Sequence, residues 1–395
     1  MVGMSLAAAL GGAGLRVVLV DRADPAGFRA PDHDARASAI ALGSRRVLEG
    51  IGVWPAMAAS AEPILDIRVT DGASLLFLHY DHRETGDQPM GHIVPNQATR
   101  VALLDRLAAC PGVSHLAPAS VGAVSRAGAV ATLDLADGRT VRARLLVAAD
   151  GRRSWMRGQA GIPVTEWSYG QTGIVCTMTH ERPHRGIAHE RFLRSGPLAF
   201  LPMTDDALGR HRSSVVWTER ADLAPKMMAL DEADFARELA RRFGPSHGAM
   251  ALAGSRQAWP LGLLFAARYR DRRLALVGDA AHAIHPISGQ GLNLGLRDVA
   301  ALAEAVVDAV RLGMDPGDPS VLARYERWRR FDGFVLAATT DSLNRLFSND
   351  IAPIRLARDL GLGAVNRLPP LKRLFMRHAM GTLGRLPRLV DGAPL

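Results

Sequence analysis

Gly278-Asp279-Ala280-Ala281-His282 and the later run His285-Pro286-Ile287-Ser288-Gly289-Gln290-Gly291-Leu292-Asn293-Leu294-Gly295-Leu296-Arg297-Asp298 are the segments that decide the fold. The first follows a short apolar run, residues 274–277, which predicts a buried strand. The second passes through a glycine-rich turn into a helix with apolar residues at helical spacing. Packing hardly explains so many small and polar residues, whereas the N–H groups that open a helix attract anions. The two segments therefore predict a strand, a turn and a helix that bind a ligand.

The beginning of the chain contains the second half of a dinucleotide-binding fingerprint. Residues 4–10 predict an alanine-rich helix, and residues 15–20 predict a strand that ends at Asp21. Gly3 stands where the third glycine of G-x-G-x-x-G belongs, and Asp21 suits a carboxylate that binds ribose hydroxyls. The second glycine would fall just before Met1, so we expect the upstream codons to encode a short apolar strand and a Gly-x-Gly. The alternative is an ordinary helix–strand unit with a glycine for packing.

A third segment, Asp150-Gly151, ends the apolar strand predicted over residues 145–149. Ser154 and Arg157 follow it, and an acid, a glycine, a hydroxyl and an arginine suit contacts with the phosphates of a nucleotide. The alternative is a capped turn, in which Asp150 or Ser154 is the N-cap of a short helix.

The composition indicates a globular protein, because 48% of the 395 residues are hydrophobic and 22% are charged. The formal net charge is +9, and nearly all of the positive charge is arginine, since Lys226 and Lys372 are the only lysines. The arginines are scattered along the chain, which argues against a nucleic-acid partner. Cys110 and Cys176 are too few for a disulfide framework and favour a reducing cytoplasm.

Neither a membrane-spanning helix nor a metal site is expected. No run of 18 apolar residues predicts a membrane-spanning helix. His282 with His285, and the run Asp32-His33-Asp34, have spacings found in metal sites but too few partners, so we expect no metal.

The middle of the chain has a different pattern. From about Trp167 to Pro260, short alternating runs bounded by glycine and proline predict an inserted antiparallel sheet. The strand over residues 274–277 returns the chain to its first domain, and long amphipathic helices follow it.

Together these segments resemble the FAD-dependent aromatic hydroxylases of the para-hydroxybenzoate hydroxylase fold. The run from His285 to Asp298 is similar to the signature of the ubiquinone-biosynthesis hydroxylases that act on polyprenylated phenols. Ser288 stands where that subfamily usually has alanine or glycine. Further matches cover essentially the whole chain: Asp34-Ala35-Arg36-Ala37, Ala41-Leu42, Ser44, Gly52-Val53-Trp54, Phe192, Gly196-Pro197, Val216-Trp217, Leu346-Phe347-Ser348 and Ala379-Met380-Gly381.

The resemblance implies an α/β fold: a Rossmann-like FAD-binding domain, whose first strand we expect upstream, an inserted antiparallel-sheet substrate domain and a helical C-terminal tail. The FAD-binding domain is expected in three parts, at residues 1–70, 96–165 and 263–312. The substrate domain is expected to take strands from residues 71–95 and its antiparallel sheet from residues 166–262. Residues 313–395 are expected to form the helical C-terminal region.

The resemblance also implies FAD as the cofactor. Asp279 would bind the ribityl chain, Asp21 the adenosine ribose, and Arg36 the pyrophosphate or ribityl region. N–H groups from Gly289 to Leu292 would face the flavin N1–C2=O edge, where reduced flavin is an anion. Arg100 or Gln97 is a further candidate, with a surface helix residue as the alternative. The complete set of expected cofactor residues is Gly3, Asp21, Arg36, Arg100, Asp150, Gly151, Gly278, Asp279, Pro286, Gly289, Gln290, Gly291, Leu292 and Asn293.

The activity implied by the resemblance is that of a monooxygenase. NAD(P)H would reduce FAD, O2 would add at flavin C4a, and the hydroperoxide would transfer oxygen to the ring of a polyprenylated phenol. No catalytic acid or base is assigned, because the cofactor carries the chemistry. Residues 192–203 would line a cavity for the apolar substrate, or else form plain domain core. Other interpretations are a hydroxylase of another aromatic or isoprenoid, and a catalytically silent FAD-binding subunit of a biosynthetic complex.

The C-terminal tail is basic and amphipathic. From Arg355 to Leu395 it has eight lysines and arginines against two aspartates, a net charge of +6, with Leu371, Leu374 and Phe375 among them. Such a segment can rest on an anionic membrane, where a polyprenylated substrate partitions. The alternative is a helix that packs its apolar side on the core. We therefore expect a cytoplasmic protein with peripheral contact at the inner face of the cytoplasmic membrane, and a quinone-biosynthesis complex as a further partner.

Overall fold

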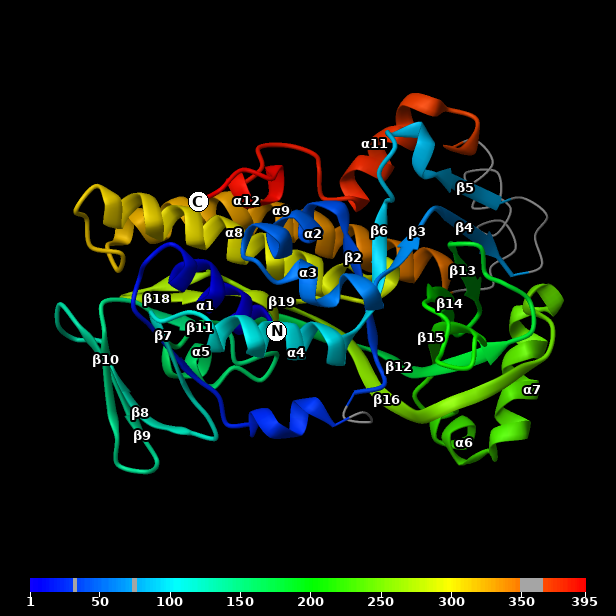
Figure 1. Ribbon diagram of the computed structural model, residues 1–395, viewed down its shortest axis with the longest axis horizontal. Coiled ribbons are helices and arrows are strands. Elements are labelled where there is room, and N and C mark those ends of the chain that lie inside the picture. The colour runs from blue at the N-terminus through cyan, green and yellow to red at the C-terminus, as the bar shows by residue number, and fades with distance from the viewer. Residues whose placement is uncertain (31–33, 73–76, 349–364) are drawn as a thin grey trace.

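The structure is a computed structural model that describes residues 1–30, 34–72, 77–348 and 365–395. Helices α8 (Gln290–Arg311) and α9 (Pro319–Phe347) pack against each other along the upper side of the molecule (Figure 1). The largest sheet lies at the right of that view, and the small sheet of β8, β9 and β10 lies at the far left. The expected α/β architecture with a helical C-terminal region is confirmed.

Two separate pairs of parallel strands lie outside the largest sheet. β1 (Val17–Val20) is rich in β-branched residues and pairs in parallel with β7 (Val113–Leu116). β11 (Leu146–Ala148) pairs in parallel with β18 (Leu274–Leu276), and β17 (Arg270–Asp271) adds an antiparallel edge. Gly3, in α1 (Val2–Gly12), touches both pairs, because a Cβ built there would lie 3.1 Å from Cβ of Ala149 and 3.8 Å from Cδ1 of Leu19.

Two three-stranded sheets flank these pairs. One has the order β2–β6–β3 and the other the order β10–β9–β8. Their strands are β2 (Ala37–Ala41), β6 (Gly91–Pro95), β3 (Glu62–Ile64), β8 (Val121–Ser125), β9 (Ala131–Leu135) and β10 (Thr140–Ala143).

The largest sheet has eight strands, in the order β19–β16–β12–β15–β14–β13–β4–β5. They are β19 (His282–Ala283), β16 (Met250–Ala266), β12 (Val164–His180), β15 (His211–Arg220), β14 (Gly196–Met203), β13 (Ile187–Leu193), β4 (Asp66–Asp71) and β5 (Phe77–Asp81). It is antiparallel except between β13 and β4.

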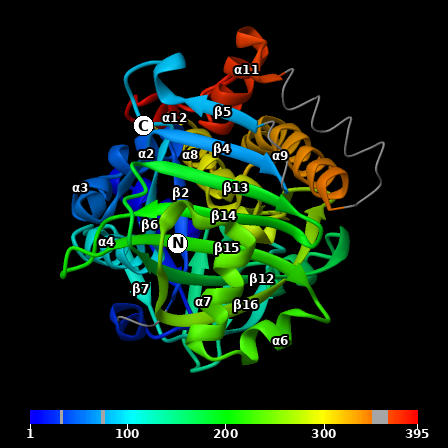
Figure 2. The same ribbon diagram turned by 90° about the vertical axis from the view of Figure 1, so that its right-hand side faces the viewer.

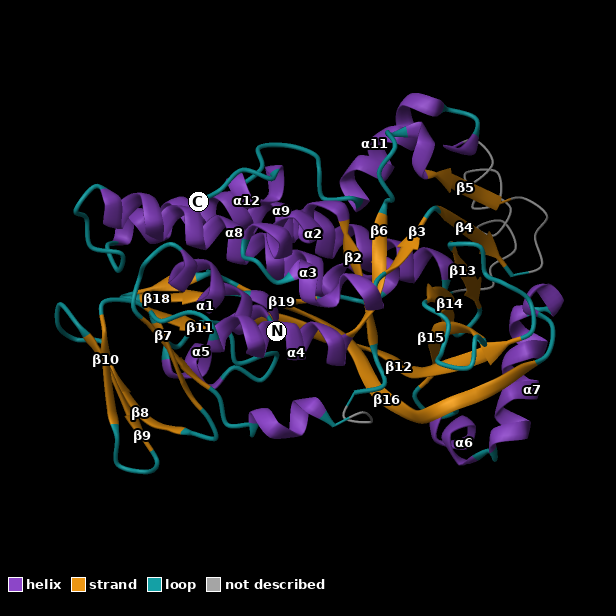
Figure 3. Cartoon of the chain, in the orientation of Figure 1, coloured by secondary structure: helices purple, strands orange, loops and turns teal. Residues whose placement is uncertain are grey.

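The expectation of short strands is wrong for β12 and β16, each of which has 17 residues. Irregularities between Ser168 and Gln171, and between Val175 and Thr177, lie within their pairing. Such irregularities let long paired strands bend without ending, so the pattern of apolar residues is interrupted while the strand continues (Figure 3).

Helix α7 (Glu232–Phe243) covers one face of the large sheet, in front of it in Figure 2. Asp231 caps the helix by accepting a hydrogen bond from the Asp234 amide at 2.7 Å. Phe235, Leu239 and Phe243 lie on one side of the helix and enter a core with sheet residues such as Trp217. This core is separate from the larger one around α1 and α8.

The remaining helices contribute to different clusters of buried residues. They are α2 (Leu42–Gly50), α3 (Trp54–Met57), α4 (Asn96–Ala108), α5 (Trp155–Gln159), α6 (Ala224–Ala229), α11 (Pro369–Ala379) and α12 (Arg388–Asp391). The 3-10 helices used below are η5 (Gly278–Ala280) and η6 (Ile287–Gly289). Within the described ranges, no helix has both the length and the apolar character to cross a bilayer.

Candidate functional site

The turn after β18 presents an accessible carboxylate. Gly278 has φ +58°, a conformation that favours glycine, and it begins η5, which carries Asp279. The Asp279 side chain is exposed, although the surrounding protein raises its pKa by desolvation. Positive charge from His282, Arg152 and Arg36 acts in the opposite direction. Asp279 is therefore an acceptor that can bind hydroxyl groups beside two guanidinium groups.

The turn from η6 into α8 is shaped by Gly289. This residue has φ +60°, and a Cβ on it would lie 2.9 Å from Cβ of Ala39 on β2. As N-cap it has no side chain, so no side-chain cap bonds the N–H groups that open α8. A Cβ on Gly291 would meet nothing within 4 Å. Uncapped N–H groups beside open space suit an electron-rich edge such as that of a flavin.

Asn293 and Gln290 hold this turn in place. The Asn293 side chain accepts from the amide of Ala41 at 2.9 Å and donates to the carbonyl of Ala39 at 2.8 Å. Gln290 donates to the carbonyl of Ala379 at 3.3 Å. Both were expected to bind the cofactor, and their side chains link the opening of α8 to β2 and to the end of α11.

Arg36 and Arg100 share one buried carboxylate, that of Asp34. Arg36 donates two hydrogen bonds to it at 2.7 Å, and Arg100 donates one at 2.8 Å. Burial raises the pKa of Asp34, but the bonds and charge of Arg36, with the charge of Arg100, outweigh it and lower the pKa to about 2. The amide of Asn96 also reaches Asp34, at 3.3 Å. Asp34 was not assigned from the sequence, although its spacing from Arg36 was a usable signal.

Four expected residues act electrostatically on the Met1 amino group, at the start of α1. Burial lowers the pKa of the Met1 amino group to about 6, with Arg100 acting in the same direction and Asp21 and Asp279 opposing it. The charge of Arg36 also lowers this pKa. Two carboxylates, which suit hydroxyl groups, and two guanidinium groups, which suit phosphates, therefore lie within electrostatic range of the start of α1, and a donor and acceptor set of this kind fits a dinucleotide.

The Asp150 segment is a capped turn, as in the alternative interpretation. Asp150 accepts from the amide of Met156 at 3.1 Å, and Ser154 caps α5 by accepting from the amide of Arg157. The buried Arg157 side chain donates to the carbonyls of Ala280 and Arg152. Ser154 and Arg157 are therefore occupied by the protein, and Arg157 ties this turn to η5. A Cβ on Gly151, which has φ +82°, would meet nothing within 4 Å.

The suspected metal ligands have other partners. His282 pairs with Asp298 at 2.6 Å, and His285 lies 3.3 Å from the side-chain oxygen of Gln171. Asp32 and His33 lie outside the described residues. Among the residues that the structure describes, no group of three or more His, Cys, Asp or Glu could hold a metal ion.

The segment at residues 192–203, expected to line the substrate cavity, divides among three clusters, one of which contains Met203. Phe192 stacks on Phe347 with ring centroids 4.1 Å apart, in a cluster with Ile287 of η6. Leu198 and Phe200 belong to the other core, beneath α7. Phe192 therefore lies beside the turn that opens α8, while the other two are domain core.

A polar pocket of about 540 Å³ lies next to this cluster. Gln171 accepts from the Asn344 amide at 3.0 Å and donates to the carbonyl of Ser195 at 2.8 Å. Since His285 also contacts Gln171, this network joins the pocket to the segment before Pro286. The pocket is lined by Trp167, Ser168, Tyr169, Gly170, Gln171, Arg194, Ser195, Arg220, Asn344, Arg345 and Ser348.

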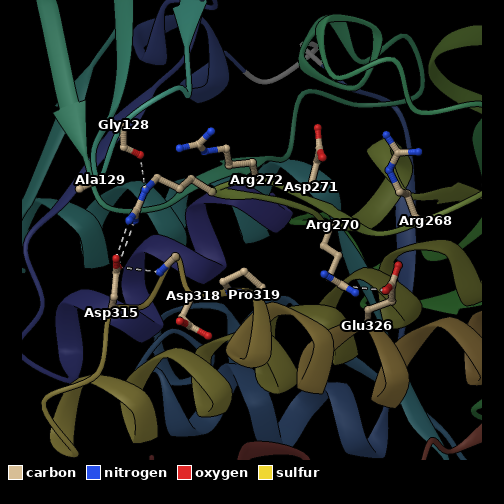
Figure 4. A pocket seen from close by; sticks show the side chains of 12 residues that line it. Gly128, Ala129, Arg268, Arg270, Asp271, Arg272, Asp315, Asp318, Pro319 and Glu326 are labelled. Carbon is tan, nitrogen blue, oxygen red and sulfur yellow. Dashed lines mark hydrogen bonds and ion pairs between the residues drawn. The ribbon is translucent and has the colours of Figure 1, made fainter.

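Another pocket, of about 530 Å³, lies at the N-terminal end of β18, opposite the end that leads to Asp279 (Figure 4). Arg270 donates to Glu326 at 2.9 Å, and Arg273 pairs with Asp315 at 2.6 Å. It is lined by Gly128, Ala129, Arg268, Arg270, Asp271, Arg272, Arg273, Asp315, Gly317, Asp318, Pro319 and Glu326, none of which belongs to the expected cofactor set.

Comparisons with known proteins show the family of the chain. The sequence model of the family described as "FAD binding domain" matches residues 1–333. Ubiquinone hydroxylase UbiL of Rhodospirillum rubrum is 54% identical over 398 residues, which cover 100% of this chain and 91% of that protein. The 3-demethoxyubiquinol 3-hydroxylase of Escherichia coli is 35% identical over 383 residues, 96% of each chain.

Solved structures show the same fold. p-Nitrophenol 4-monooxygenase PnpA from Pseudomonas putida has a TM-score of 0.80 at 21% identity, over 98% of this chain and 96% of that protein. The family model covers more than half of the chain, and the relatives align along nearly all of it. The chain therefore belongs to the FAD-binding family of flavin-dependent monooxygenases that includes the ubiquinone hydroxylases.

Proposed function

We propose that this chain hydroxylates the aromatic ring of a polyprenylated phenol in ubiquinone biosynthesis, with O2 and NAD(P)H as co-substrates. When bound, FAD supplies the redox chemistry, taking electrons from NAD(P)H and activating O2. The observation that carries the proposal is that the turn with the accessible carboxylate of Asp279 packs against α8, whose opening has no side-chain cap. The 54% identity to a ubiquinone hydroxylase supports the pathway.

The chain's own residues bind and orient the cofactor in this proposal. Asp279 and Asp21 accept hydrogen bonds from ribityl and ribose hydroxyls, and Arg36 with Arg100 neutralises the pyrophosphate. Asp34 holds both guanidinium groups in place through three hydrogen bonds. The N–H groups at the start of α8 stabilise negative charge on the reduced flavin ring.

The substrate ring lies, in this proposal, between η6 and the eight-stranded sheet. Ile287, Phe192 and Phe347 form an apolar cluster there, which suits a prenylated ring. The sheet and α9 limit access of water to the reacting atoms, as oxygen activation requires.

The C-terminal helix α11 suits peripheral contact with an anionic membrane. Leu374 and Phe375 are exposed together with Arg373 and Arg377, whereas Met376 packs inward. The expectation that Lys372 belongs to the basic surface is wrong, because it is buried and pairs with Glu84 at 2.5 Å. Arg355, Arg358 and Asp359 lie outside the described residues. A cytoplasmic enzyme at the inner membrane face, within a quinone-biosynthesis complex, would receive a substrate that partitions into the bilayer.

Two measurements test the function. Purified protein should retain FAD on desalting, and it should oxidise NADH or NADPH faster when a prenylated phenol is added. Retained FAD without phenol-dependent oxidation would instead indicate a catalytically silent subunit. Turnover with a different aromatic or an isoprenoid only would support the other hydroxylase interpretation.

Asp279→Asn tests the site itself. The charge-assisted bonds of a carboxylate contribute more than those of an amide, so we expect the FAD dissociation constant to rise about 10- to 100-fold. Titration of FAD into apoprotein, followed by flavin fluorescence, measures it. Asp137→Asn is the matched control, because Asp137 lies in an exposed turn and pairs with Arg139. Unchanged affinity in Asp279→Asn would exclude Asp279 from the cofactor site.

A further inference from the structure

A buried carboxylate on α8 holds both sides of the turn that carries Asp279. Oδ2 of Asp298 accepts from the Gly278 amide at 3.0 Å and lies 2.6 Å from Nε2 of His282. Gly278 precedes Asp279 directly, and His282 follows it by three residues. We propose that Asp298 is a positioning residue, which sets the direction of the Asp279 carboxylate toward FAD without touching the cofactor.

An arginine on α9 holds the Asp298 carboxylate in turn. Arg329 on α9 donates from Nε to Oδ1 of Asp298 at 2.8 Å and from Nη1 to Asp332 at 2.6 Å. The Asp298 side chain is 0% exposed and that of Arg329 is 4% exposed. Burial raises the pKa of Asp298, but the His282 and Arg329 interactions outweigh it, so the carboxylate stays charged. A charged acceptor binds the Gly278 N–H more strongly than a neutral one would.

The position of Asp298 along α8 gives this arrangement its function. Asp298 lies eight residues after Gln290, roughly two helical turns from the opening of the helix. One rigid helix therefore carries both the N–H groups assigned to the flavin ring and the carboxylate that fixes η5. Other bonds restrain the same turn, from Tyr325 to the carbonyl of Leu276 at 2.7 Å and from Arg157 to that of Ala280 at 2.9 Å. Among these contacts, Asp298 alone touches both flanks of Asp279.

A double-mutant cycle on FAD affinity tests this inference, which rests on the proposed role of Asp279. Asp298→Asn in the full chain should raise the FAD dissociation constant about 10-fold or more. If Asp298 acts through Asp279, adding Asp298→Asn to Asp279→Asn should raise the FAD dissociation constant by less than about 3-fold further. If Asp298 had only a structural role, the losses of FAD affinity in the two single variants would multiply in the double variant. Multiplied losses, or unchanged affinity in Asp298→Asn, would overturn the inference.

Controls separate positioning from unfolding. Asp308→Asn changes an aspartate of the same helix that pairs with Arg324 at the surface, so it should leave FAD affinity unchanged. Circular dichroism and urea midpoints of the apoproteins report folding. If Asp298→Asn does not fold, Arg329→Lys keeps the charge but loses the fork that joins Asp298 to Asp332. It should raise the dissociation constant about 3- to 10-fold, again only while Asp279 is present.

The two proposals fail in different ways. If Asp279→Asn leaves FAD affinity unchanged, the assignment of Asp279 to the cofactor is wrong, and the positioning role falls with it. If Asp279→Asn weakens FAD binding and neither Asp298→Asn nor Arg329→Lys does, only the positioning role is wrong.

Discussion

The two ends of β18 use the same residue types for different purposes. At its N-terminal end, Arg270 pairs with Glu326 near the surface, with exposed side-chain fractions of 36% and 18%. Beyond its C-terminal end, Arg329 pairs with Asp298 in the interior, at 4% and 0%. Each carboxylate also accepts from a backbone amide, Glu326 from that of Tyr269 at 2.8 Å and Asp298 from that of Gly278 at 3.0 Å, but only Asp298 binds the turn that carries Asp279. The comparison teaches that burial, rather than the number of charges, distinguishes the end of the strand that we assign to the cofactor.

Replacing one arginine of each pair should give the largest difference. Arg329→Met removes the arginine from the fully buried Asp298, so we expect a loss of about 3–5 kcal/mol in the free energy of unfolding. Arg270→Met removes a partly exposed pair and should cost about 1 kcal/mol or less. Urea unfolding of both variants measures the two values. Equal losses would show that burial does not distinguish the two ends.

The features of the two ends of β18 that lie within one segment could be predicted from the sequence. Gly278-Asp279 and the glycine turn before α8 are local patterns, and in the structure one packs against α8 while the other opens the same helix. The roles of Asp34 and Asp298 depend on Arg100 and Arg329, which are distant in the sequence and meet only in the folded chain. The parallel pairing of β13 with β4 joins strands more than 100 residues apart, and no local pattern encodes it. The expected roles of Asn293 and Gln290 could not be refined from sequence, because β2 and α11 are their partners.

A third region sharpens the comparison, because its buried groups are held neutral rather than charged. The rings of His180 and His247 have centroids 4.6 Å apart, and His189 lies 5.6 Å from His247. Burial, with the nearby histidines, lowers the pKa of His247 to about 3, and burial with Arg68 lowers that of His189 to about 4. Both rings are therefore neutral in the folded protein at pH 7.

Acid should destabilise this histidine cluster. The unfolded chain takes up protons near the usual pKa of about 6.5, well before the folded protein does, so stability is lost as the pH falls from about 6.5 toward 4. We expect a loss of about 1–3 kcal/mol per histidine, measured from urea midpoints at pH 7 and pH 4.5. His247→Asn should reduce this pH dependence. His82→Asn should leave it unchanged, because His82 lies outside the cluster and bonds the carbonyl of Leu65. The same pH dependence in all three proteins would assign the acid sensitivity to other groups.

Gly289→Ala tests whether the two ends of β18 also differ in cofactor binding. Alanine at φ +60° is strained, and its Cβ would approach Cβ of Ala39 at 2.9 Å, so we expect a loss of about 1–2 kcal/mol. Because this strain shifts the opening of α8, the FAD dissociation constant should rise about 10-fold. Gly317→Ala is the matched change at the other end, where a Cβ would meet the carbonyl of Arg144 in the pocket of Figure 4. Gly317→Ala should destabilise the protein by a similar or larger amount. It should leave FAD affinity unchanged, because neither Gly317 nor Arg144 belongs to the cofactor set. If Gly317→Ala weakens FAD binding in proportion to its loss of stability, affinity follows global stability, and the functional distinction between the two ends of β18 is lost.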